Sequence, residues 1–379
     1  MLSKTEKGED MRNNFENISV QNVLLKPGGE IVSGVREWKE IMRPYWRELI
    51  LTEEYGKIRG ADKISVSVSV ATEKEGDFAG KSCLQSLIFT FTSGELTHTV
   101  KCELAYPKSA ENTPCPFFIY IDFRPGIPER YCPAEEIIDN GFGVFHVCHN
   151  DITTDDGDFE NGLAKFFVRG ERKSDDPGKI AIWSYFLQKM MDYLLTRPEA
   201  DSTAIGVSGH SRLGKTALLT AALDERFAFC CPNNSGCSGV AISRGKPSDA
   251  ESVAAICRNF PYWFCPKYQT YSDREEALPF DQHCVVSLVA PRMVCVGVAE
   301  LDSWADNDGQ MLALCEADKV WKLYGARGFV CGKARLDTGD AFTDGELGFF
   351  VRKGTHYHSR DDWKIYMSAV NHYLKNRKQ

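Results

Sequence analysis

From residue 114 onward, the chain alternates between short apolar runs and longer segments with helical spacing. The run "PCPFFIYIDF" (114–123) is almost continuously apolar, which is typical of a central strand buried on both faces. Similar patterns predict strands at 142–149, 202–209, 226–233, 292–300 and 347–354, and helices at 178–198, 212–224, 308–325 and 360–376. This alternation predicts an α/β fold, a three-layer sandwich in which helices cover both faces of a mostly parallel sheet.

Three segments depart from this alternation. Residues 33–58 have apolar side chains at helical spacing, which predicts a helix that packs on the core and ends before Gly60. Residues 63–106 contain alternating β patterns that look antiparallel. Residues 238–282 look like an insertion that could cap the carboxyl ends of the strands, where ligands bind in such folds. We therefore expect an N-terminal extension (1–60) and a single domain (61–379).

Composition narrows the classes of partner. Hydrophobic residues make up 43% of the chain, charged residues make up 26%, and the net charge is −8, which argues against nucleic acid or an anionic membrane as a partner. The 14 cysteines form no C-x-x-C pair, so we expect buried free thiols and no zinc site. The N-terminus lacks an apolar signal region and no run could span a bilayer, which predicts a cytoplasmic protein.

The stretch "SGHSRLGKTA" (208–217) fits two incompatible motifs. Residues 209–216 match G-x-x-x-x-G-K-[ST], a loop that binds nucleotide phosphates. The same letters place Ser211 two residues after a glycine, between a predicted strand and a predicted helix, as in the nucleophile elbow of an α/β-hydrolase. Both motifs require strand, turn and helix, so the stretch alone does not separate them.

Chain order favours the elbow. A phosphate-binding loop usually follows the first strand of its domain, whereas about 200 residues precede this one. Hydrolases of this fold carry serine, acid and histidine in that order. Carboxylates follow a strand in "VGVAELDSW" and histidines follow the last strand in "VRKGTHYH". These groups would meet at the carboxyl edge of one sheet.

One detail departs from the usual elbow, G-x-S-x-G. The second position after Ser211 is Leu213, and the glycine comes one residue later, at Gly214. Ser208 is a weaker candidate nucleophile, because it is followed by His210 at the second position and lies too early for the turn.

The motif "GHSRLGK" resembles the G-x-S-R-x-G-K signature of the glucuronoyl esterases, carbohydrate esterase family 15. The likeness extends in order through "GFGVFHVCHNDI", "NNSGCSG", "FPYWFC", "LPFDQHCVVSLVAPR", "ELDSWAD" and "GTHYHSRDDW", over about residues 115–370. The resemblance implies a serine esterase that attacks esters of a glucuronic acid carried on xylan. It implies Ser211 as nucleophile and His356 as base, since His356 stands at the family's distance before Trp363.

Other histidines and carboxylates compete for these roles. His358 is the chief rival of His356, while His283 is expected to be structural. His210 could line the site but, as the neighbour of Ser211, is expected to point elsewhere. Many family members carry a glutamate before "SG", where this chain has Asn234. Since an amide cannot balance an imidazolium, the acid should come from "AELDSWAD".

Within that segment we favour Asp302 over Glu300, because Asp302 falls where the fold usually orients its histidine. Asp306 is expected to be a loop or capping residue.

The resemblance also implies how substrate is held. The backbone N–H of Arg212, together with its side chain, would face the oxyanion, with a second donor near Arg124 and Pro125. Lys215 and Trp304 match the family's sugar-contacting lysine and tryptophan, and Glu251 is a candidate for binding sugar hydroxyls.

The sequence thus predicts a serine carboxylester hydrolase without metal or cofactor, acting on a small-molecule or oligosaccharide uronate ester through an acyl-enzyme. A carbohydrate deacetylase such as an acetyl xylan esterase is the alternative ester specificity. A nucleotide-binding protein using 209–216, or an oligosaccharide-binding pseudoenzyme, is the alternative class. The acidic stretch 151–160 does not fit the EF-hand spacing, and we expect a solvated loop there.

Overall fold

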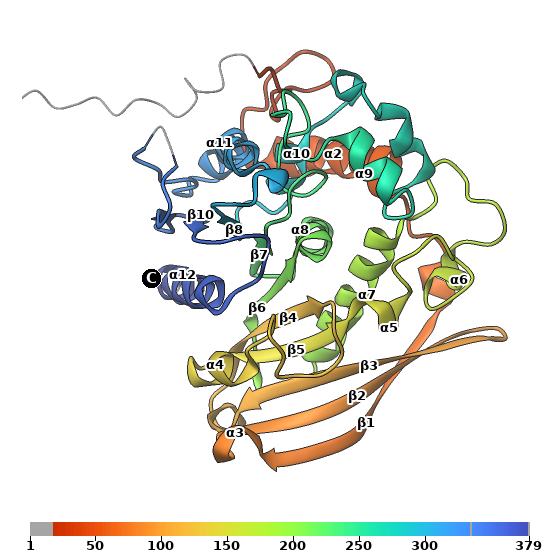
Figure 1. Cartoon of the computed structure of the whole chain (residues 1–379), viewed down its shortest axis with the longest axis vertical. Helices are drawn as coiled ribbons and strands as arrows, with labels where there is room; N and C mark the ends of the chain where they lie inside the picture. Colours follow the sequence, from red (N-terminus) through yellow and green to blue (C-terminus); the bar gives the residue numbers. More distant parts are fainter. Residues whose placement is uncertain (1–17, 334–335, 378–379) are drawn as a thin grey trace, which may run out of the picture.

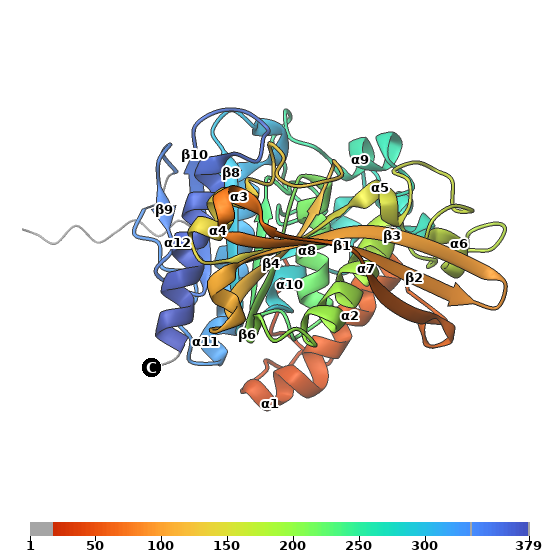
Figure 2. The same cartoon turned by 90° about the horizontal axis from the view of Figure 1, so that it is seen from below.

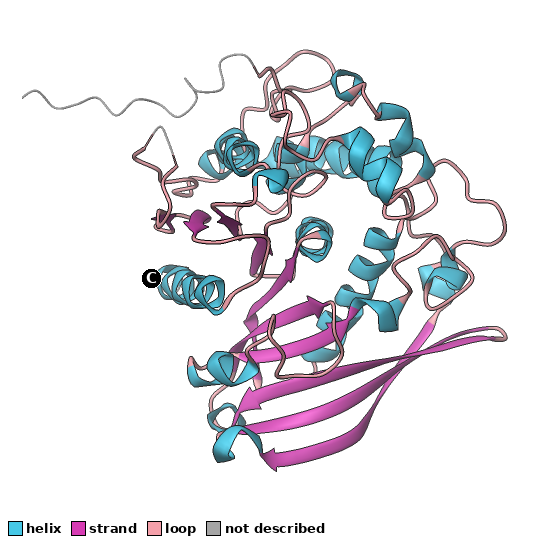
Figure 3. Cartoon of the chain, viewed as in Figure 1, coloured by secondary structure: helices cyan, strands magenta, loops and turns pink. Residues whose placement is uncertain are grey.

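The computed structural model describes residues 18–333 and 336–377. Within them, one ten-stranded sheet has the order β1-β2-β3-β5-β4-β6-β7-β8-β10-β9 (Figures 1 and 3). The strands are β1 (Ser65–Gly76), β2 (Ser82–Ser93), β3 (Leu96–Pro107), β4 (Cys115–Asp122), β5 (Gly143–Cys148), β6 (Ala200–His210), β7 (Phe229–Asn233), β8 (Met293–Ala299), β9 (Ala341–Phe342) and β10 (Leu347–Arg352).

The centre of the sheet is parallel and both of its edges are antiparallel. Strands β5, β4, β6, β7, β8 and β10 pair in parallel with their neighbours. Strands β1, β2 and β3 form an antiparallel ribbon that joins β5, and the short β9 lies antiparallel to β10. The predicted α/β class with a mostly parallel central sheet is confirmed, as is the antiparallel ribbon that precedes it.

Helices cover both faces of the sheet (Figures 1 and 2). Along β4 the side chains alternate between two cores: Phe117 and Ile119 face one, Phe118 and Tyr120 the other. The first core contains α2, α7, α8, α10 and α11, and the second contains α4 and α12. The helices are α1 (Val35–Glu37), α2 (Arg43–Ile50), α3 (Asp77–Gly80), α4 (Ala134–Asp139), α5 (His149–Ile152), α6 (Ala164–Phe167), α7 (Lys179–Leu194), α8 (Arg212–Leu223), α9 (Val253–Asn259), α10 (Gln282–Ser287), α11 (Asn307–Leu323) and α12 (Arg360–Arg377).

The helical segment near the N-terminus packs on the first core. It runs as α1, a π-helical segment (Trp38–Met42), α2 and a second π-helical segment (Leu51–Tyr55), so it ends earlier than the predicted 58. The segment ends at Gly56, which has φ +86°, and a Cβ there would lie 2.4 Å from the carbonyl oxygen of Asp176. Residues 1–17 of the predicted extension lie outside the described residues, and the division at residue 60 stays a prediction.

Short helices are where the sequence patterns fail. Helices α4, α5, α6, α9 and α10 have four to seven residues each and were not predicted. Two turns or fewer offer little periodicity, and all six residues of α10 are buried, so no polar face marks it. Helix α9 lies in the predicted insertion 238–282.

The cysteines behave as predicted. All 14 fall within the described residues and all are free thiols, 13 of them buried. Burial raises the pKa of most of these thiols, for example to about 11 at Cys148, so those thiols are protonated and pack as small apolar side chains. Among the described residues, no helix combines the length and apolar character that a bilayer span requires.

Candidate active site

Ser211 occupies a sharp turn between β6 and α8. Its backbone has φ 58° and ψ −124°, a conformation that a non-glycine residue rarely adopts. The turn is held because the Ser211 N–H donates to the carbonyl of Asn233 at the end of β7, at 2.8 Å. This is the strand–turn–helix context that a nucleophile elbow requires.

Close packing explains why the glycine pattern of this elbow is shifted. A Cβ at Gly209 would lie 2.4 Å from the carbonyl oxygen of Leu213, and one at Gly214 would lie 3.0 Å from that of Asn233. The tight approaches therefore occur two residues before and three residues after Ser211. Leu213 is fully buried and its side chain fills the core instead.

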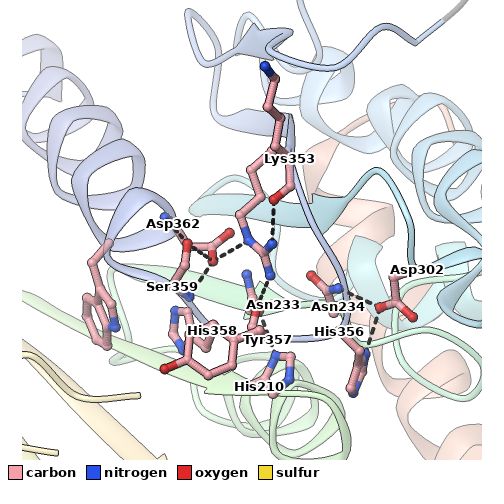
Figure 4. A network of polar contacts seen from close by, with 12 residues as sticks. His210, Asn233, Asn234, Asp302, Lys353, His356, Tyr357, His358, Ser359 and Asp362 are labelled. Carbon is pink, nitrogen blue, oxygen red and sulfur yellow. Dashed lines mark hydrogen bonds and ion pairs between the residues drawn. The ribbon is translucent and has the colours of Figure 1, made fainter. Parts of the chain in front are cut away.

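His356 and Asp302 are hydrogen-bonded to each other (Figure 4). The Nδ1 of His356 lies 2.6 Å from Oδ2 of Asp302. Burial opposes ionisation of Asp302, but the hydrogen bonds from His356 and Asn234 outweigh it and lower the pKa of this carboxyl. The contact fixes the imidazole so that Nε2 is the nitrogen left for chemistry.

His358 lies in the core rather than at the site. It is fully buried, stacks on Trp363 with ring centroids 5.0 Å apart, and its Nδ1 lies 3.0 Å from the Tyr120 hydroxyl. Burial, followed by the charge of Arg352, lowers its pKa to about 3. His283 is also buried, with Nε2 2.8 Å from the carbonyl of Gln21, as expected for a structural histidine.

His210 lies beside His356, so it borders the site, as the sequence allowed, and does not point elsewhere. Its ring centroid lies 4.5 Å from that of His356, and Figure 4 shows the two rings side by side. Its Nδ1 donates to the side-chain oxygen of Asn233 at 2.7 Å, an assignment that follows because Asn233 uses its NH₂ on Tyr366. Burial, followed by the charges of nearby histidines, holds the pKa of His210 well below its usual value. A neutral ring therefore packs against His356.

Three polar residues near Asp302 have different environments. Asn234, where the resemblance implies a glutamate, donates its side-chain N–H to Asp302 Oδ2. Glu300 is exposed and lines a different cavity. Asp306 caps the first turn of α11 by accepting from the N–H of Gly309 at 2.9 Å, which confirms it as a capping residue.

A cavity of about 330 Å³ gathers most of the predicted residues. It lies at the carboxyl edge of the parallel strands, next to the predicted insertion. Its lining consists of Ser211, Arg212, Lys215, Asn234, Ser235, Gly236, Glu251, Phe260, Trp263, Asp302, Trp304, Ala305 and His356. Glu300, the alternative acid, does not line this cavity. Neither do Arg124 and Pro125, so the second oxyanion donor stays a prediction.

Lys215 and Glu251 form a buried pair on one wall. The ammonium of Lys215 donates to the carbonyls of Ser235 and Cys237, each at 2.6 Å, and lies 3.6 Å from a Glu251 carboxylate oxygen. These contacts commit the lysine to this wall rather than to a phosphate above the loop. On the rim, Trp304 is 48% exposed and presents a free aromatic surface.

Arg212 is held by a residue that the sequence patterns did not single out. Its Nη1 donates to Asp155, and its guanidinium lies over the Trp263 ring, 4.8 Å from the centroid. The prediction of a solvated loop over 151–160 is therefore wrong for Asp155, although Asp156, Gly157 and Asp158 are exposed.

Phe260 and Trp263, from "FPYWFC" in the insertion, also line the cavity without having been predicted as site residues. Their rings stack at 3.9 Å. The sequence signal that could have identified them is the cluster of aromatic residues in the segment expected to cap the site.

Comparison with known proteins assigns the family. A family model described as "Glucuronyl esterase, fungi" matches residues 89–325. Carbohydrate esterase MZ0003, from an unknown prokaryotic organism, is 35% identical over 252 residues, which cover 66% of this chain and 57% of the relative. A 4-O-methyl-glucuronoyl methylesterase from Podospora anserina is 27% identical, over 61% of this chain and 51% of the relative. The chain thus spans little more than half the length of these curated relatives.

The fold agrees over almost the whole chain. The solved structure of a glucuronoyl esterase from Solibacter usitatus superposes with a TM-score of 0.86 at 28% identity, covering 94% of this chain and 98% of that one. A second, a promiscuous CE15 esterase from a marine bacterial metagenome, gives 0.82 at 26% identity. These likenesses confirm the predicted α/β-hydrolase fold. Together with the family model, they show that the chain belongs to the glucuronyl esterase family, carbohydrate esterase family 15.

Proposed function

We propose that this protein is a serine carboxylester hydrolase that cleaves esters of glucuronic acid or 4-O-methyl-glucuronic acid. One observation carries the proposal: His356, bonded to Asp302 at 2.6 Å, lines the same cavity as the strained Ser211. A serine hydroxyl needs such a neighbouring base to act as a nucleophile near neutral pH.

In the proposed first half-reaction, the Ser211 Oγ attacks the ester carbonyl carbon while His356 Nε2 takes the hydroxyl proton. Asp302 stabilises the imidazolium that forms. The tetrahedral intermediate then collapses, the C–O bond to the alcohol breaks, and the alcohol leaves with the proton from His356. The product is a uronoyl ester on Ser211.

In the second half-reaction, water gives a proton to His356 and attacks the acyl carbon; the bond from that carbon to Ser211 Oγ then breaks, Oγ takes the proton back from His356, and the uronate is released. Both tetrahedral intermediates carry an oxyanion. The Arg212 N–H opens α8 and has no partner within its own helix, so it is suited to stabilise that charge together with the Arg212 side chain.

The uronate specificity is proposed from the walls of the cavity. Lys215 and Glu251 place a cation and an anion where sugar hydroxyls and a ring oxygen could bond, and Trp304 offers an aromatic face for a sugar ring. The relatives named as 4-O-methyl-glucuronoyl methylesterases support the same substrate class.

The test is a comparison of two esters. The full chain should hydrolyse methyl glucuronate and leave an acetylated sugar largely intact, because a deacetylase needs only a small acetyl pocket. Cleavage of the acetyl ester alone would refute the uronate specificity. A fluorophosphonate probe should label the wild type but not Ser211→Ala, which would exclude a pseudoenzyme.

The contacts of Lys215 argue against a nucleotide-binding function. The Lys215 ammonium is committed to two carbonyls and Glu251, and the family is one of esterases. Calorimetry with Mg-ATP should therefore detect no binding. The cytoplasmic location stays a prediction from the sequence.

A further inference from the structure

We propose that Asp155 is a positioning residue that holds the Arg212 guanidinium beside the reacting ester. This inference depends on the proposed function in one respect: the Arg212 guanidinium is taken to stabilise the oxyanion of the ester reaction. Asp155 lies in the loop after α5, and Arg212 is the first residue of α8. The two are 57 residues apart in the chain.

Asp155 binds two groups of the site at once. One carboxylate oxygen, Oδ2, accepts from Arg212 Nη1, and the other, Oδ1, accepts from the indole N–H of Trp263 at 2.6 Å. The guanidinium in turn lies over the Trp263 ring. One carboxylate therefore fixes both the cation and the aromatic surface on which it stacks.

This arrangement uses one Nη1 N–H of Arg212 and leaves other guanidinium donors for a ligand. Among the described residues, the buried Nε–H of Arg212 has no hydrogen-bond partner. The guanidinium is also flanked by the rings of Phe123 and Phe260, at 5.3 and 5.6 Å, which cannot accept a strong hydrogen bond. Arg212 also lines the cavity that holds Ser211, so a negatively charged oxygen above Ser211 would accept from the guanidinium N–H groups that Asp155 does not use.

Asp155 is itself fixed from behind. The His149 Nε2 lies 3.6 Å from its Oδ2, and His149 Nδ1 donates to the carbonyl of Asp122, the last residue of β4, at 3.0 Å. Burial would raise the pKa of Asp155, but His149 and the charge of Arg212 outweigh it and lower that pKa. The carboxylate is therefore ionised at neutral pH.

A buried lysine anchors the rest of the acidic loop. The Lys179 ammonium donates to the Thr153 hydroxyl at 2.8 Å and to the carbonyl of Asp158 at 2.5 Å. The two hydrogen bonds from Lys179 therefore hold both ends of the segment 153–158. Asp155 itself connects three other parts of the chain: the end of β4 through His149, α8 through Arg212, and the insertion through Trp263.

The positioning role makes a specific kinetic prediction for Asp155→Asn. An amide keeps the shape but loses the charge, so the guanidinium gains freedom to move. We expect kcat on methyl glucuronate to fall about 10- to 100-fold with KM changed less than about threefold, because misplacement costs the transition state more than the ground state. The matched control is Asp156→Asn, an exposed neighbour bonded within its own loop, which should retain wild-type kinetics.

A double variant tests whether Asp155 acts through Arg212 or only supports the fold. Arg212→Lys should slow turnover, and the double variant with Asp155→Asn should be no slower than Arg212→Lys alone, since Asp155 acts through the arginine. Multiplied effects in the double variant, or equal behaviour of Asp155→Asn and Asp156→Asn, would overturn the proposal. Should Asp155→Asn fail to fold in a thermal-unfolding check, Asp155→Glu carries the same cycle.

A second readout does not depend on the uronate substrate. Ser211 displaces fluoride from the phosphorus of a fluorophosphonate, and the phosphoryl oxygen then occupies the oxyanion position. The rate of this labelling should fall in Asp155→Asn but not in Asp156→Asn. If wild type labels yet cleaves no uronate ester, the proposed substrate fails while the labelling rates still decide the role of Asp155.

Discussion

The side-chain N–H of Asn234 donates to Asp302 Oδ2, the same oxygen that accepts from His356. An amide therefore stands at the place where the family resemblance implies a glutamate, and it bonds instead to the acid that follows the neighbouring strand. Asn234 follows β7 and Asp302 follows β8. Because β7 and β8 are parallel neighbours, the two positions lie side by side at one edge of the sheet.

Replacing each of the two candidate acids by its amide should affect kcat/KM very differently. Asp302→Asn removes the charge that stabilises the His356 imidazolium, so kcat/KM on a glucuronate ester should fall by about 10³-fold or more. Glu300→Gln should stay within about twofold, since its exposed side chain lines another cavity. Steady-state kinetics of both variants decide the matter, and the reverse order would move the acid to Glu300.

Replacing His356 should affect catalysis, whereas replacing His358 should affect stability. The side chain of His356 is 43% exposed, so His356→Ala should abolish turnover while changing the unfolding free energy by less than about 1 kcal/mol. His358→Ala empties a buried site against Trp363 and should cost about 2–4 kcal/mol of stability. Urea unfolding and activity per folded molecule measure both. An inactive but stable His358→Ala would contradict this assignment.

Trp304 should affect substrate binding more than chemistry. Its half-exposed ring lines the cavity, and among the described residues Trp304 forms no hydrogen bond with His356 or Asp302. Loss of an aromatic platform costs about one to two kcal/mol, so Trp304→Ala should raise KM about tenfold with kcat nearly unchanged. A fall in kcat with constant KM would show instead that Trp304 orders the loop that carries Asp302.

Glu54 should make stability depend on pH. It is fully buried against Gln282, and burial raises its pKa to about 8. The folded state therefore keeps a proton that the unfolded chain releases near the usual 4.5, so this stabilisation is complete below about pH 4.5 and is lost as pH rises through 8. Glu54→Gln cannot titrate, and its stability relative to wild type should rise over this window by up to about 1.4 kcal/mol per pH unit.

Urea unfolding at pH 5, 7 and 9 tests the Glu54 prediction. Glu40→Gln, on the same helical segment but exposed, serves as the control and should follow the wild-type pH dependence. Parallel curves for wild type and Glu54→Gln would mean that Glu54 is ionised in the folded protein.

Local pattern and chain order were sufficient for the architecture and for the elbow. The apolar run of β4 predicted a buried central strand, and the spacing of 178–198 predicted α7, because both signals reside in neighbouring residues. The placement of Ser211 between β6 and α8 followed from the same local signals. Serine, carboxylate and histidine each follow a predicted strand, β6, β8 and β10, and this order predicted that all three lie at one sheet edge.

Only the tertiary structure decided which side chains meet. His356 and His358 are two residues apart, yet one ring reaches Asp302 across 54 residues while the other is buried on Trp363. The sequence predicted a solvated loop around Asp155, because no local pattern reveals that its partner, Arg212, lies 57 residues away. Side-chain direction and burial are set by packing between distant segments, and those contacts exist only once the chain has folded.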